Sequence, residues 1–333
     1  MPEAEFTVLV TWDHFAEPGL GMLRAAGCEV LFLGPAKNKA ELDACLATRK
    51  IDGLVSRTVE LDAAALRSCP SLRVVSKHGV GVNNIDVAAA TELGIPVTST
   101  PGANSQSVAE LTVGLIIAAA RRIPWLVDEV RHGRWSRVQD GYQLSGQTLG
   151  LVGLGQVGRR VAAVAAALGM DVVAYDPVLA GDPAADGVRR LPRLADLLRV
   201  ADVLSLHVPL TADTRGMIGA DEIALLPHGA LVVNTSRGEV LDESALAEGL
   251  RTGRLRAAAL DTLAVEPVRP DDPLLALDNV FVTPHVGGST TASVAAVGSA
   301  AATNLLAVLR GETVDRRRQV NPSAFTAAGG DVR

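Results

Sequence analysis

The chain has 333 residues, which is long enough for two domains of ordinary size, each with its own hydrophobic core. Its formal net charge is −6, and this acidic balance argues against binding to nucleic acids or anionic membrane surfaces, because both require a basic face. Aromatic residues make up only 3% of the sequence, a composition typical of small-residue helices packed on an aliphatic sheet.

The cysteines and the N-terminus indicate the compartment. Cys28, Cys45 and Cys69 are odd in number and lack C-x-x-C spacing, which favours reduced thiols over a disulfide framework or a metal site. The N-terminal segment has acids where a secretory signal would carry positive charge. The longest apolar run, residues 111–120, is too short to span a bilayer. We therefore expect a soluble cytoplasmic protein without metal, nucleic acid or membrane partners.

Strands and helices alternate along the first hundred residues. Strands are predicted at residues 6–10, 29–33, 53–56, 72–76 and 96–98, and helices at residues 18–26, 40–49 and 63–68. This alternation predicts a parallel sheet covered on both faces, in a flavodoxin-like or Rossmann-like unit that lacks a phosphate loop. Residues 105–132 then read as one long apolar helix, interrupted at Pro124. A helix this apolar should be buried as a link between domains or at a subunit interface, and homodimerisation is the simplest explanation.

The stretch from Thr148 to Asp176 passes from an apolar strand through a glycine-rich turn and a helix to a second strand that ends in an acid. Gly153, Gly155 and Gly158 form a G-x-G-x-x-G motif, which permits a tight turn, close approach of a pyrophosphate and close helix packing. The helix N-terminus would bind the phosphates. Asp176 could hydrogen-bond the ribose hydroxyls of NAD and would repel the 2′-phosphate of NADP. Glycines that merely serve turns are the alternative, but the four features together favour NAD binding.

Later elements continue the same alternation. Strands are predicted at residues 203–207, 231–234, 257–260 and 280–282, and helices at residues 193–198, 221–226 and 243–252. A helix at residues 290–310 leads to a short stretch at 319–322 and is expected to return to the first domain, because the nucleotide unit is already complete. Residues 326–333 are predicted to be frayed. The predicted fold class is α/β, with two Rossmann-like or flavodoxin-like domains, each built on a doubly wound parallel sheet.

Three polar side chains follow later strands of the nucleotide unit: Arg237, Glu266 and His285. An arginine at a strand end can grip a carboxylate with two hydrogen bonds, and a histidine can pass a proton to or from a hydroxyl. A neighbouring glutamate would favour the imidazolium and fix its tautomer. Singly, the arginine could cap a helix, and the glutamate and histidine could belong to ordinary loops. Together they could bind a 2-oxo acid and protonate its carbonyl while NADH delivers hydride.

The sequence resembles the D-isomer-specific 2-hydroxyacid dehydrogenases, in the branch that includes D-3-phosphoglycerate dehydrogenase. The resemblance rests on motifs in the order and spacing of that family: KHGVGVNNID at 77–86, TPGANSQSVAELT at 100–112, GLGQVG at 153–158, NTSRGEVLDE at 234–243, AALDTLAVEP at 258–267 and TPHVGGST at 283–290. It implies that Arg237, Glu266 and His285 are the catalytic residues. It also implies an NAD-binding domain at residues 103–289, inserted into a discontinuous substrate domain at residues 1–102 and 290–333, with the active site in the cleft.

The resemblance further implies residues that bind substrate and cofactor. The turn Gly79, Val80 and Gly81 would offer backbone N–H groups to the substrate carboxylate, although its glycines could serve only a tight turn. The cofactor residues would be Gln156 and Val157 at the pyrophosphate, His207, Val208 and Pro209 on the adenosine side, and Thr235, Ser236, Arg237, Asp261, His285, Gly287 and Gly288 around the nicotinamide. Asp261 has an alternative structural role, as a turn former at the end of a strand.

The sequence says less about the chemical nature of the substrate's side chain. A phosphorylated substrate needs cations at its distal end, and residues 56–61 supply Arg57, while Glu60 would be unfavourable if it faced the site. An ungapped pairing places Ser56 where phosphoglycerate-type sequences often have an arginine. We also expect the protein to lack the regulatory domain of many long phosphoglycerate dehydrogenases.

We predict an NAD-dependent D-2-hydroxyacid dehydrogenase that acts as a homodimer on a small 2-hydroxy or 2-oxo acid, with 3-phosphoglycerate among the candidates. The alternatives are a hydroxypyruvate or glyoxylate reductase and a non-enzymatic, NADH-sensing protein that resembles transcriptional corepressors.

Overall fold

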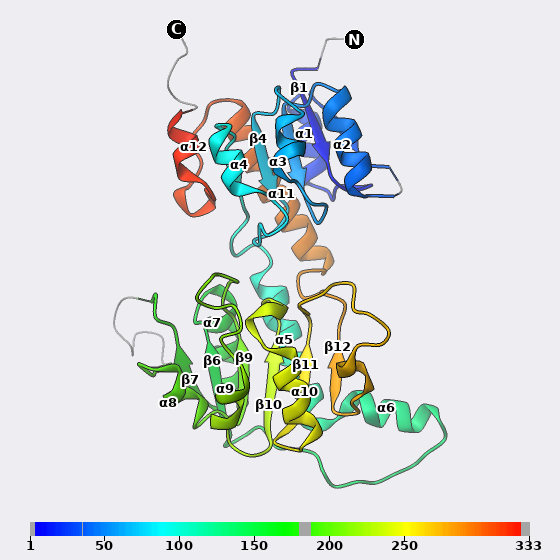
Figure 1. Cartoon of the computed structure of the whole chain (residues 1–333), viewed down its shortest axis with the longest axis vertical. Coiled ribbons are helices and arrows are strands. Elements are labelled where there is room, and N and C mark those ends of the chain that lie inside the picture. Colours follow the sequence, from blue (N-terminus) through cyan, green and yellow to red (C-terminus); the bar gives the residue numbers. More distant parts are fainter. Residues whose placement is uncertain (1–3, 35, 180–187, 328–333) are drawn as a thin grey trace. The chain divides into compact units, whose positions relative to one another are not determined.

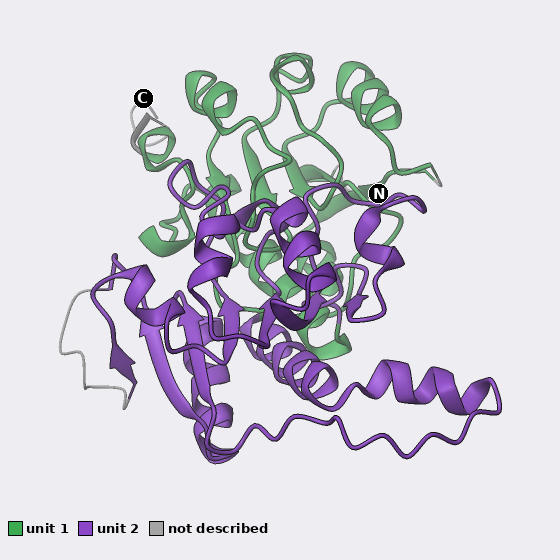
Figure 2. Ribbon diagram, turned by 60° about the horizontal axis from the view of Figure 1, so that its bottom comes forward, with its two compact units in different colours: residues 1–104, 290–333 green, residues 105–289 purple. Residues whose placement is uncertain are grey.

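The structure is a computed structural model that describes residues 4–34, 36–179 and 188–327. The chain divides into two compact units, which Figure 2 distinguishes by colour. Unit 1 comprises residues 1–104 and 290–333, and unit 2 comprises residues 105–289. Each unit is built on one parallel sheet with helices on its faces (Figure 1), so the predicted α/β fold class is confirmed.

Unit 1 contains a five-stranded parallel sheet in the order β2-β1-β3-β4-β5. Its strands are β1 (Phe6–Val10), β2 (Cys28–Phe32), β3 (Gly53–Ser56), β4 (Val74–Lys77) and β5 (Val97–Thr98). The chain moves from β1 to β2 on one side and then to β3 on the other side. The strand order therefore reverses between β1 and β3, and open α/β sheets bind ligands outside the carboxyl ends of strands at such a point.

The helices of unit 1 include two that the sequence pattern did not reveal. They are α1 (Gly19–Ala25), α2 (Lys39–Thr48), α3 (Ala63–Arg67), α4 (Val87–Glu92), α11 (Thr291–Leu309) and α12 (Pro322–Ala327), with a 3₁₀ turn, η3, at Arg316–Arg318. The unpredicted helices are α4 and α12, and both are too short to show a clear hydrophobic period. The Asp86 side chain caps α4. The prediction of fraying from residue 326 is wrong for Thr326 and Ala327, which belong to α12, and residues 328–333 lie outside the described residues.

Helix α11 lies in unit 1 and packs against its sheet. Ala301, Ala302 and Leu305 of α11 are fully buried in the same cluster as Val55 and Val74 of β3 and β4. α11 is long and apolar enough to cross a membrane by length and composition. Because its apolar residues fill this core, we interpret α11 as a core helix.

Unit 2 contains a seven-stranded parallel sheet in the order β12-β11-β10-β9-β6-β7-β8. Its strands are β6 (Thr148–Val152), β7 (Asp171–Tyr175), β8 (Arg189–Arg190), β9 (Val203–Leu206), β10 (Ala230–Asn234), β11 (Leu255–Leu260) and β12 (Val280–Val282). The strand order reverses between β6 and β9, which is the arrangement of a dinucleotide-binding fold. Strands β9 and β10 are buried along their whole length, as expected for a sheet covered on both faces.

The helices of unit 2 cover both faces of this sheet and enclose a hydrophobic cluster on each. They are α5 (Ser105–Arg121), α6 (Ile123–Arg131), α7 (Gln156–Ala167), α8 (Leu194–Leu198), α9 (Ala220–Leu225) and α10 (Glu243–Arg251), with 3₁₀ turns η1 (Gly238–Val240) and η2 (Pro273–Ala276). The predicted helices of this half are thus confirmed, apart from the first.

The prediction of one long, buried helix at residues 105–132, interrupted at Pro124, is wrong in its burial, and the interruption lies two residues earlier, at Arg122. α5 ends at Arg121, Arg122 adopts a left-handed conformation with φ 52°, and α6 then begins at Ile123. Pro124 lies in the first turn of α6, where its missing N–H is not needed. α5 is buried against α7 and the sheet, whereas no residue of α6 is buried. Only α5 is therefore a core helix, and α6 projects from the body of unit 2 (Figures 1 and 2).

Replacing Leu305 with alanine should lower the free energy of unfolding by about 2–5 kcal/mol, because a fully buried leucine leaves a cavity between α11 and the sheet. Urea denaturation followed by circular dichroism measures the change. Thr303→Ala, at an exposed position of the same helix, is the matched control. A Leu305→Ala variant as stable as this control would contradict the packing of α11.

Candidate active site

The glycine-rich turn joins β6 to α7 and depends on three glycines. Gly153 has φ 97°, and a Cβ there would lie 2.6 Å from the His207 carbonyl oxygen. A Cβ at Gly158 would lie 2.4 Å from the Gly153 carbonyl oxygen. Only glycine fits either position, because one needs a left-handed backbone and both need close approach of backbone atoms.

Gly155 differs from its two neighbours because nothing crowds it. It is the N-cap of α7, and no heavy atom lies within 4 Å of the position that a Cβ would take. The backbone of Gln156 and Val157 forms the first turn of α7, whose N–H groups have no intrahelical partner. A side chain at Gly155 would occupy this open space. The turn therefore fits a pyrophosphate, which needs free N–H groups and close approach.

Asp176 follows β7 directly, and its carboxylate lies against the glycine-rich turn. Oδ2 accepts a hydrogen bond from the Leu154 N–H at 2.9 Å, and Oδ1 accepts one from the Val178 N–H at 3.1 Å. Each carboxylate oxygen keeps further acceptor capacity, so Asp176 can also accept hydrogen bonds from ribose hydroxyls. Its negative charge suits NAD better than NADP.

Strand β9 ends beside the same turn, so His207, Val208 and Pro209 lie at the point where the strand order of unit 2 reverses. The His207 ring Nε2 is 2.9 Å from the Ser205 hydroxyl oxygen. Burial lowers the pKa of His207 to about 4, so the ring is neutral at pH 7. Val208 approaches the turn as well, with its Cγ1 3.1 Å from the Cβ position of Gly153. The structure thus brings the predicted adenosine-side residues to the glycine-rich turn.

Thr235 and Ser236 follow β10, and hydrogen bonds fix their side chains. The Thr235 hydroxyl oxygen is 2.8 Å from that of Thr112 on α5. The Ser236 hydroxyl donates to Asn234 Oδ1 at 2.8 Å, and Asn234 Nδ2 donates to the Arg237 carbonyl oxygen at 2.8 Å. These bonds hold the backbone from which the Arg237 side chain extends.

The Arg237 guanidinium forms a hydrogen bond to a backbone carbonyl group and no ion pair within the described residues. Its Nη1 donates to the Ser236 carbonyl oxygen at 2.6 Å. Burial lowers its pKa, and the charges of Glu266 and Glu239 oppose this effect. Arginine is basic enough to stay charged. Among the described residues no carboxylate forms an ion pair with it; the nearby acids Glu266 and Glu239 pair with His285 and Arg215. The remaining N–H groups can bind a planar anion.

Asp261 follows β11 and anchors the loop after β12. It is 2% exposed, and its Oδ1 accepts hydrogen bonds from the Thr283 hydroxyl at 2.6 Å and the Val286 N–H at 2.9 Å. Its Oδ2 accepts one from the Gly287 N–H at 2.8 Å. A Cβ at Gly287 would lie 2.9 Å from this oxygen, so the close approach favours glycine. Asp261 therefore has its alternative structural role, and contact of Asp261, Gly287 and Gly288 with the nicotinamide stays a prediction.

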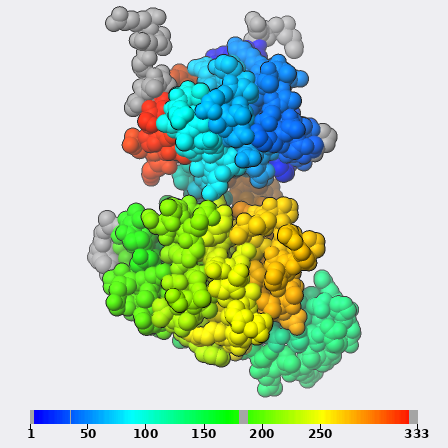
Figure 3. Space-filling view, viewed as in Figure 1, coloured from blue at the N-terminus to red at the C-terminus, as the bar shows by residue number. Residues whose placement is uncertain are grey.

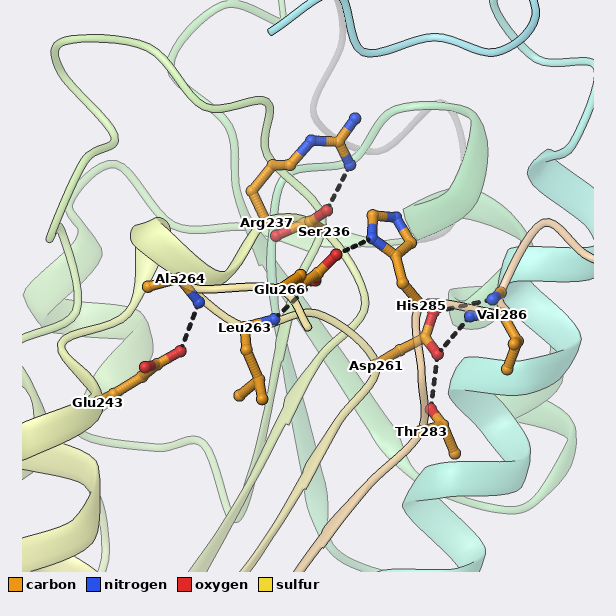
Figure 4. A network of polar contacts seen from close by, with 11 residues as sticks. Ser236, Arg237, Glu243, Asp261, Leu263, Ala264, Glu266, Thr283, His285 and Val286 are labelled. Atoms are coloured by element: carbon orange, nitrogen blue, oxygen red, sulfur yellow. Dashed lines mark hydrogen bonds and ion pairs between the residues drawn. The ribbon is translucent and has the colours of Figure 1, made fainter. Parts of the chain in front are cut away.

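His285 lies in this anchored loop and meets Glu266 (Figure 4). Its φ of 54° is uncommon for a residue other than glycine. His285 Nδ1 is 2.8 Å from Glu266 Oε2, and Glu266 Oε1 accepts a hydrogen bond from the Leu263 N–H at 2.9 Å. The side chains of His285 and Glu266 are 48% and 38% exposed, so both can reach a ligand.

The charge state of Glu266 follows from its surroundings. Burial alone would raise the pKa of Glu266, but hydrogen bonds from His285 and the Leu263 N–H outweigh it, and the pKa lies below its usual value. The carboxylate is therefore ionised at neutral pH and lies in hydrogen-bond contact with His285 Nδ1. Because this pKa is depressed, the ionised carboxylate contributes to folding stability. The contribution is present above the usual pKa of a free carboxyl group and is lost as the pH falls through the acidic range.

The three catalytic candidates lie together because β10, β11 and β12 are neighbours in the sheet. Arg237, Glu266 and His285 follow these strands in that order, and parallel strands present their carboxyl ends at one edge. Figure 4 shows the Arg237 side chain beside the Glu266–His285 pair. The arrangement offers a cation, Arg237, that can bind the carboxylate of a ligand. It also offers a proton donor, His285, that the ionised Glu266 holds in place.

The predicted substrate residues lie in unit 1. The turn at residues 79–81 follows β4; Gly79 has φ 138°, and its carbonyl oxygen accepts hydrogen bonds from the N–H and the hydroxyl of Thr100, both at 3.0 Å. Val80 is 46% exposed at the tip of the turn. Arg57 directly follows the neighbouring strand β3. The two strand ends lie side by side, because the His78 N–H donates to the Ser56 carbonyl oxygen at 2.9 Å.

Arg57 stacks on an aromatic residue that the sequence analysis did not single out. Its Cζ lies 4.5 Å from the centre of the Trp12 ring, and Trp12 follows β1, on the other side of the strand reversal in unit 1. Lys37 Nζ lies at the same distance from the ring and pairs with Asp13. Burial lowers the pKa of Arg57, and Asp13 opposes this. The available signal in the sequence was that Trp12 lies two residues after the end of the first apolar strand.

The lysine at the end of β4 stiffens the segment that carries Arg57. Lys77 Nζ donates to the Arg57 carbonyl oxygen, and to Asn84 Oδ1 at 2.5 Å. Asn84 Nδ2 in turn donates to the Ser56 hydroxyl and to the Val59 carbonyl oxygen. Residues on both sides of Arg57 are thus tied to the end of β4.

Comparison with known proteins agrees with this geometry. Residues 113–287 match the family described as D-isomer specific 2-hydroxyacid dehydrogenase, NAD binding domain. The chain is 45% identical to D-3-phosphoglycerate dehydrogenase of Methanocaldococcus jannaschii over 267 residues, which is 79% of this chain and 51% of that protein. It is 40% identical to glyoxylate reductase of Korarchaeum cryptofilum over 268 residues, which is 78% of this chain and 80% of that protein.

The fold agrees with solved structures as well. The crystal structure of cofactor (NAD⁺) bound 3-phosphoglycerate dehydrogenase of Entamoeba histolytica matches with a TM-score of 0.80 at 29% identity, covering 96% of this chain and 99% of that chain. The chain spans about half the length of the D-3-phosphoglycerate dehydrogenases of Methanocaldococcus jannaschii and Archaeoglobus fulgidus. The family match covers more than half of the chain, and the glyoxylate reductase is matched over most of its length. The chain therefore belongs to the D-isomer specific 2-hydroxyacid dehydrogenase family, and it carries that family's NAD-binding domain.

Proposed function

We propose that the protein is an NAD-dependent oxidoreductase that interconverts a small 2-hydroxy acid and the corresponding 2-oxo acid. The observation that carries the proposal is the 2.8 Å hydrogen bond between Glu266 and His285, with Arg237 at the end of a neighbouring strand. The glycine-rich turn and Asp176 of the same unit supply the features that NAD binding requires. The names of the relatives agree with this class of reaction.

Each side chain has a role that follows from its contacts. The free N–H groups of Arg237 bind the carboxylate and orient the carbonyl group of the 2-oxo acid. Because His285 Nδ1 bonds to Glu266, Nε2 is the nitrogen that gives a proton to the carbonyl oxygen. NADH, when bound, supplies the hydride for the carbonyl carbon. The ionised Glu266 stabilises the imidazolium before transfer, and in the reverse reaction His285 takes the proton back from the hydroxyl.

His285→Ala should lower kcat by about 100-fold or more, because the proton donor is removed, while leaving the Kd for NADH nearly unchanged. Stopped-flow or steady-state oxidation of NADH gives kcat, and fluorescence titration gives the Kd. His228→Ala, at an exposed position of the same unit, is the control and should behave like the unaltered protein. Unchanged turnover in His285→Ala would remove this residue from the mechanism.

We further propose that unit 1 binds the substrate, with the turn at Gly79, Val80 and Gly81 offering N–H groups to the carboxylate and Arg57 facing the distal end. The Arg57 guanidinium stacks on Trp12, and among the described residues no carboxylate forms an ion pair with it. A stacked, half-buried cation without an anionic partner suits a second anionic group on the substrate. This favours a phosphorylated or dicarboxylic 2-oxo acid, such as the oxidised form of 3-phosphoglycerate, over hydroxypyruvate or glyoxylate.

A panel of 2-oxo acids with NADH tests the function and the substrate together. Acids with a distal phosphate or carboxylate should be turned over with a higher kcat/KM than glyoxylate or hydroxypyruvate. Arg57→Ala should lower kcat/KM for the preferred acid by about tenfold or more, because a hydrogen bond to a charged group is lost, and should spare glyoxylate. Arg67→Ala, an exposed arginine of the same unit, is the control.

The panel also separates the enzyme from its alternatives. Preference for glyoxylate or hydroxypyruvate, unaffected by Arg57→Ala, would favour the reductase reading and refute the distal role of Arg57. Tight NADH binding without turnover of any acid would favour an NADH-sensing protein and would overturn the proposed activity.

We also propose that the protein is a cytoplasmic homodimer. Its three cysteines are free, as expected of a reducing compartment. The arm, defined as α6 and residues 132–139, presents apolar side chains to solvent: Ile123, Val127, Val130, Trp135 and Val138 are 42–76% exposed. The first three lie on one face of α6 by their spacing. The arm stands out from the surface of unit 2 (Figure 3), and a second copy would cover its apolar face.

The double variant Val127→Asp and Val130→Asp should convert the dimer to a monomer, because it places two charges on the face to be buried. Light scattering coupled to size-exclusion chromatography should give twice the 34.5 kDa chain mass before the change and that mass once after it. Asp128→Asn, on another face of α6, should leave the dimer intact. A monomeric unaltered protein, or a dimeric double variant, would contradict this use of the arm.

A further inference from the structure

Glu243 contacts the loop that carries Glu266, although it lies on a different element. It is the first residue of α10, and its Oε1 accepts a hydrogen bond from the Ala264 N–H at 2.7 Å (Figure 4). Ala264 precedes Glu266 by two residues. We propose that Glu243 is a positioning residue, which fastens the loop at residues 263–266 so that the Glu266 carboxylate meets His285. The proposal rests on the proposed dehydrogenase function only for its kinetic consequences.

The hydrogen bond between Glu243 and Ala264 has no role in capping α10. An acidic residue in the first turn of a helix commonly bonds to that helix's own free N–H groups. Here Asp242 already accepts hydrogen bonds from the Ser244 and Ala245 N–H groups, at 2.9 and 3.0 Å. The Glu243 side chain instead reaches Ala264, 21 residues further along the chain. Its contact is therefore with the loop and not with its own helix.

The loop is held closely from a second side. A Cβ at Gly238 would lie 1.9 Å from the Leu263 carbonyl carbon and 2.1 Å from the Ala264 nitrogen. The Leu263–Ala264 peptide thus rests directly on the Gly238 backbone. The consecutive backbone N–H groups of Leu263 and Ala264 donate to two different carboxylates, the first to Glu266 and the second to Glu243. The backbone that orients Glu266 is thus fixed between Gly238 and Glu243.

The surroundings of Glu243 make this placement costly for a carboxylate. Burial is the main reason that the pKa of Glu243 is raised, and the charges of Asp272, Glu239 and Glu266 add to it, while the Ala264 N–H opposes it. An acid half-buried near three other acids needs a compensating bond. The Ala264 N–H is the donor that provides it, so loss of the side chain would release the loop.

Three variants separate position from charge. Glu243→Gln keeps an oxygen that can accept the Ala264 N–H and removes the charge. Glu243→Ala removes the acceptor, and Glu243→Met removes it while keeping the side-chain volume, in case the alanine variant fails to fold. Glu248→Ala is the matched control, because Glu248 lies on the same helix, exposed and paired with Arg251.

Two readouts are followed in the full chain. The first is kcat and KM for the acid preferred in the panel. The second is the NMR signal of the proton on His285 Nδ1, which reports the hydrogen bond to Glu266 and needs no turnover. Glu243→Ala and Glu243→Met should lower kcat by about tenfold, since small misplacement of a catalytic group is costly, leave KM within about twofold, and lose or shift the Nδ1 proton signal. Glu243→Gln and Glu248→Ala should keep both readouts.

The outcomes are decisive in either direction. An unchanged Nδ1 signal and unchanged kcat in the alanine and methionine variants would overturn the proposal. Equal losses in Glu243→Gln would also overturn it, since charge and not position would then matter. If no acid in the panel is turned over, the proposed function fails, and the NMR readout still tests whether Glu243 holds the pair together.

Discussion

The buried carboxylate of Asp261 holds the candidate site in its working geometry. A buried carboxylate is costly unless donors surround it, and the loop after β12 supplies three, the Thr283 hydroxyl and two backbone N–H groups. Because the loop closes round Asp261, His285 is held in a left-handed conformation that a histidine rarely adopts. From that position its Nδ1 reaches Glu266. One anchoring carboxylate thus determines where the proposed proton donor lies.

The charged residues of the site have two kinds of role: some anchor the backbone, and others can contact a ligand. Asp261 is buried and fully engaged, whereas Glu266 and His285 remain accessible to a ligand. The pKa of Glu266 is lowered by its hydrogen bonds, while that of Glu243 behind it is raised mainly by burial. Glu266, beside His285, therefore stays ionised, and Glu243 accepts a hydrogen bond from the backbone N–H of Ala264.

Parallel sheets explain why each unit gathers its polar residues at one edge. In unit 2 the strand order reverses between β6 and β9, where the glycine-rich turn meets His207, and the adjacent strands bring Arg237 and His285 to the same edge. In unit 1 it reverses between β1 and β3, where Trp12 and Arg57 stack. Both arrangements place a cation or free N–H groups where an anionic ligand would bind.

The sequence by itself determined the fold class, most strands and helices, the family and the glycine-rich turn, because these depend on local periodicity and on short motifs with fixed spacing. Tertiary structure alone decided that the break after α5 falls at Arg122 and not at Pro124, that α6 is exposed, and that Glu243 bonds to Ala264. It also decided that Asp261 serves the loop of His285. These features depend on contacts between residues far apart in the chain, and hydrophobic pattern does not encode which donor meets which acceptor once the strands have come together.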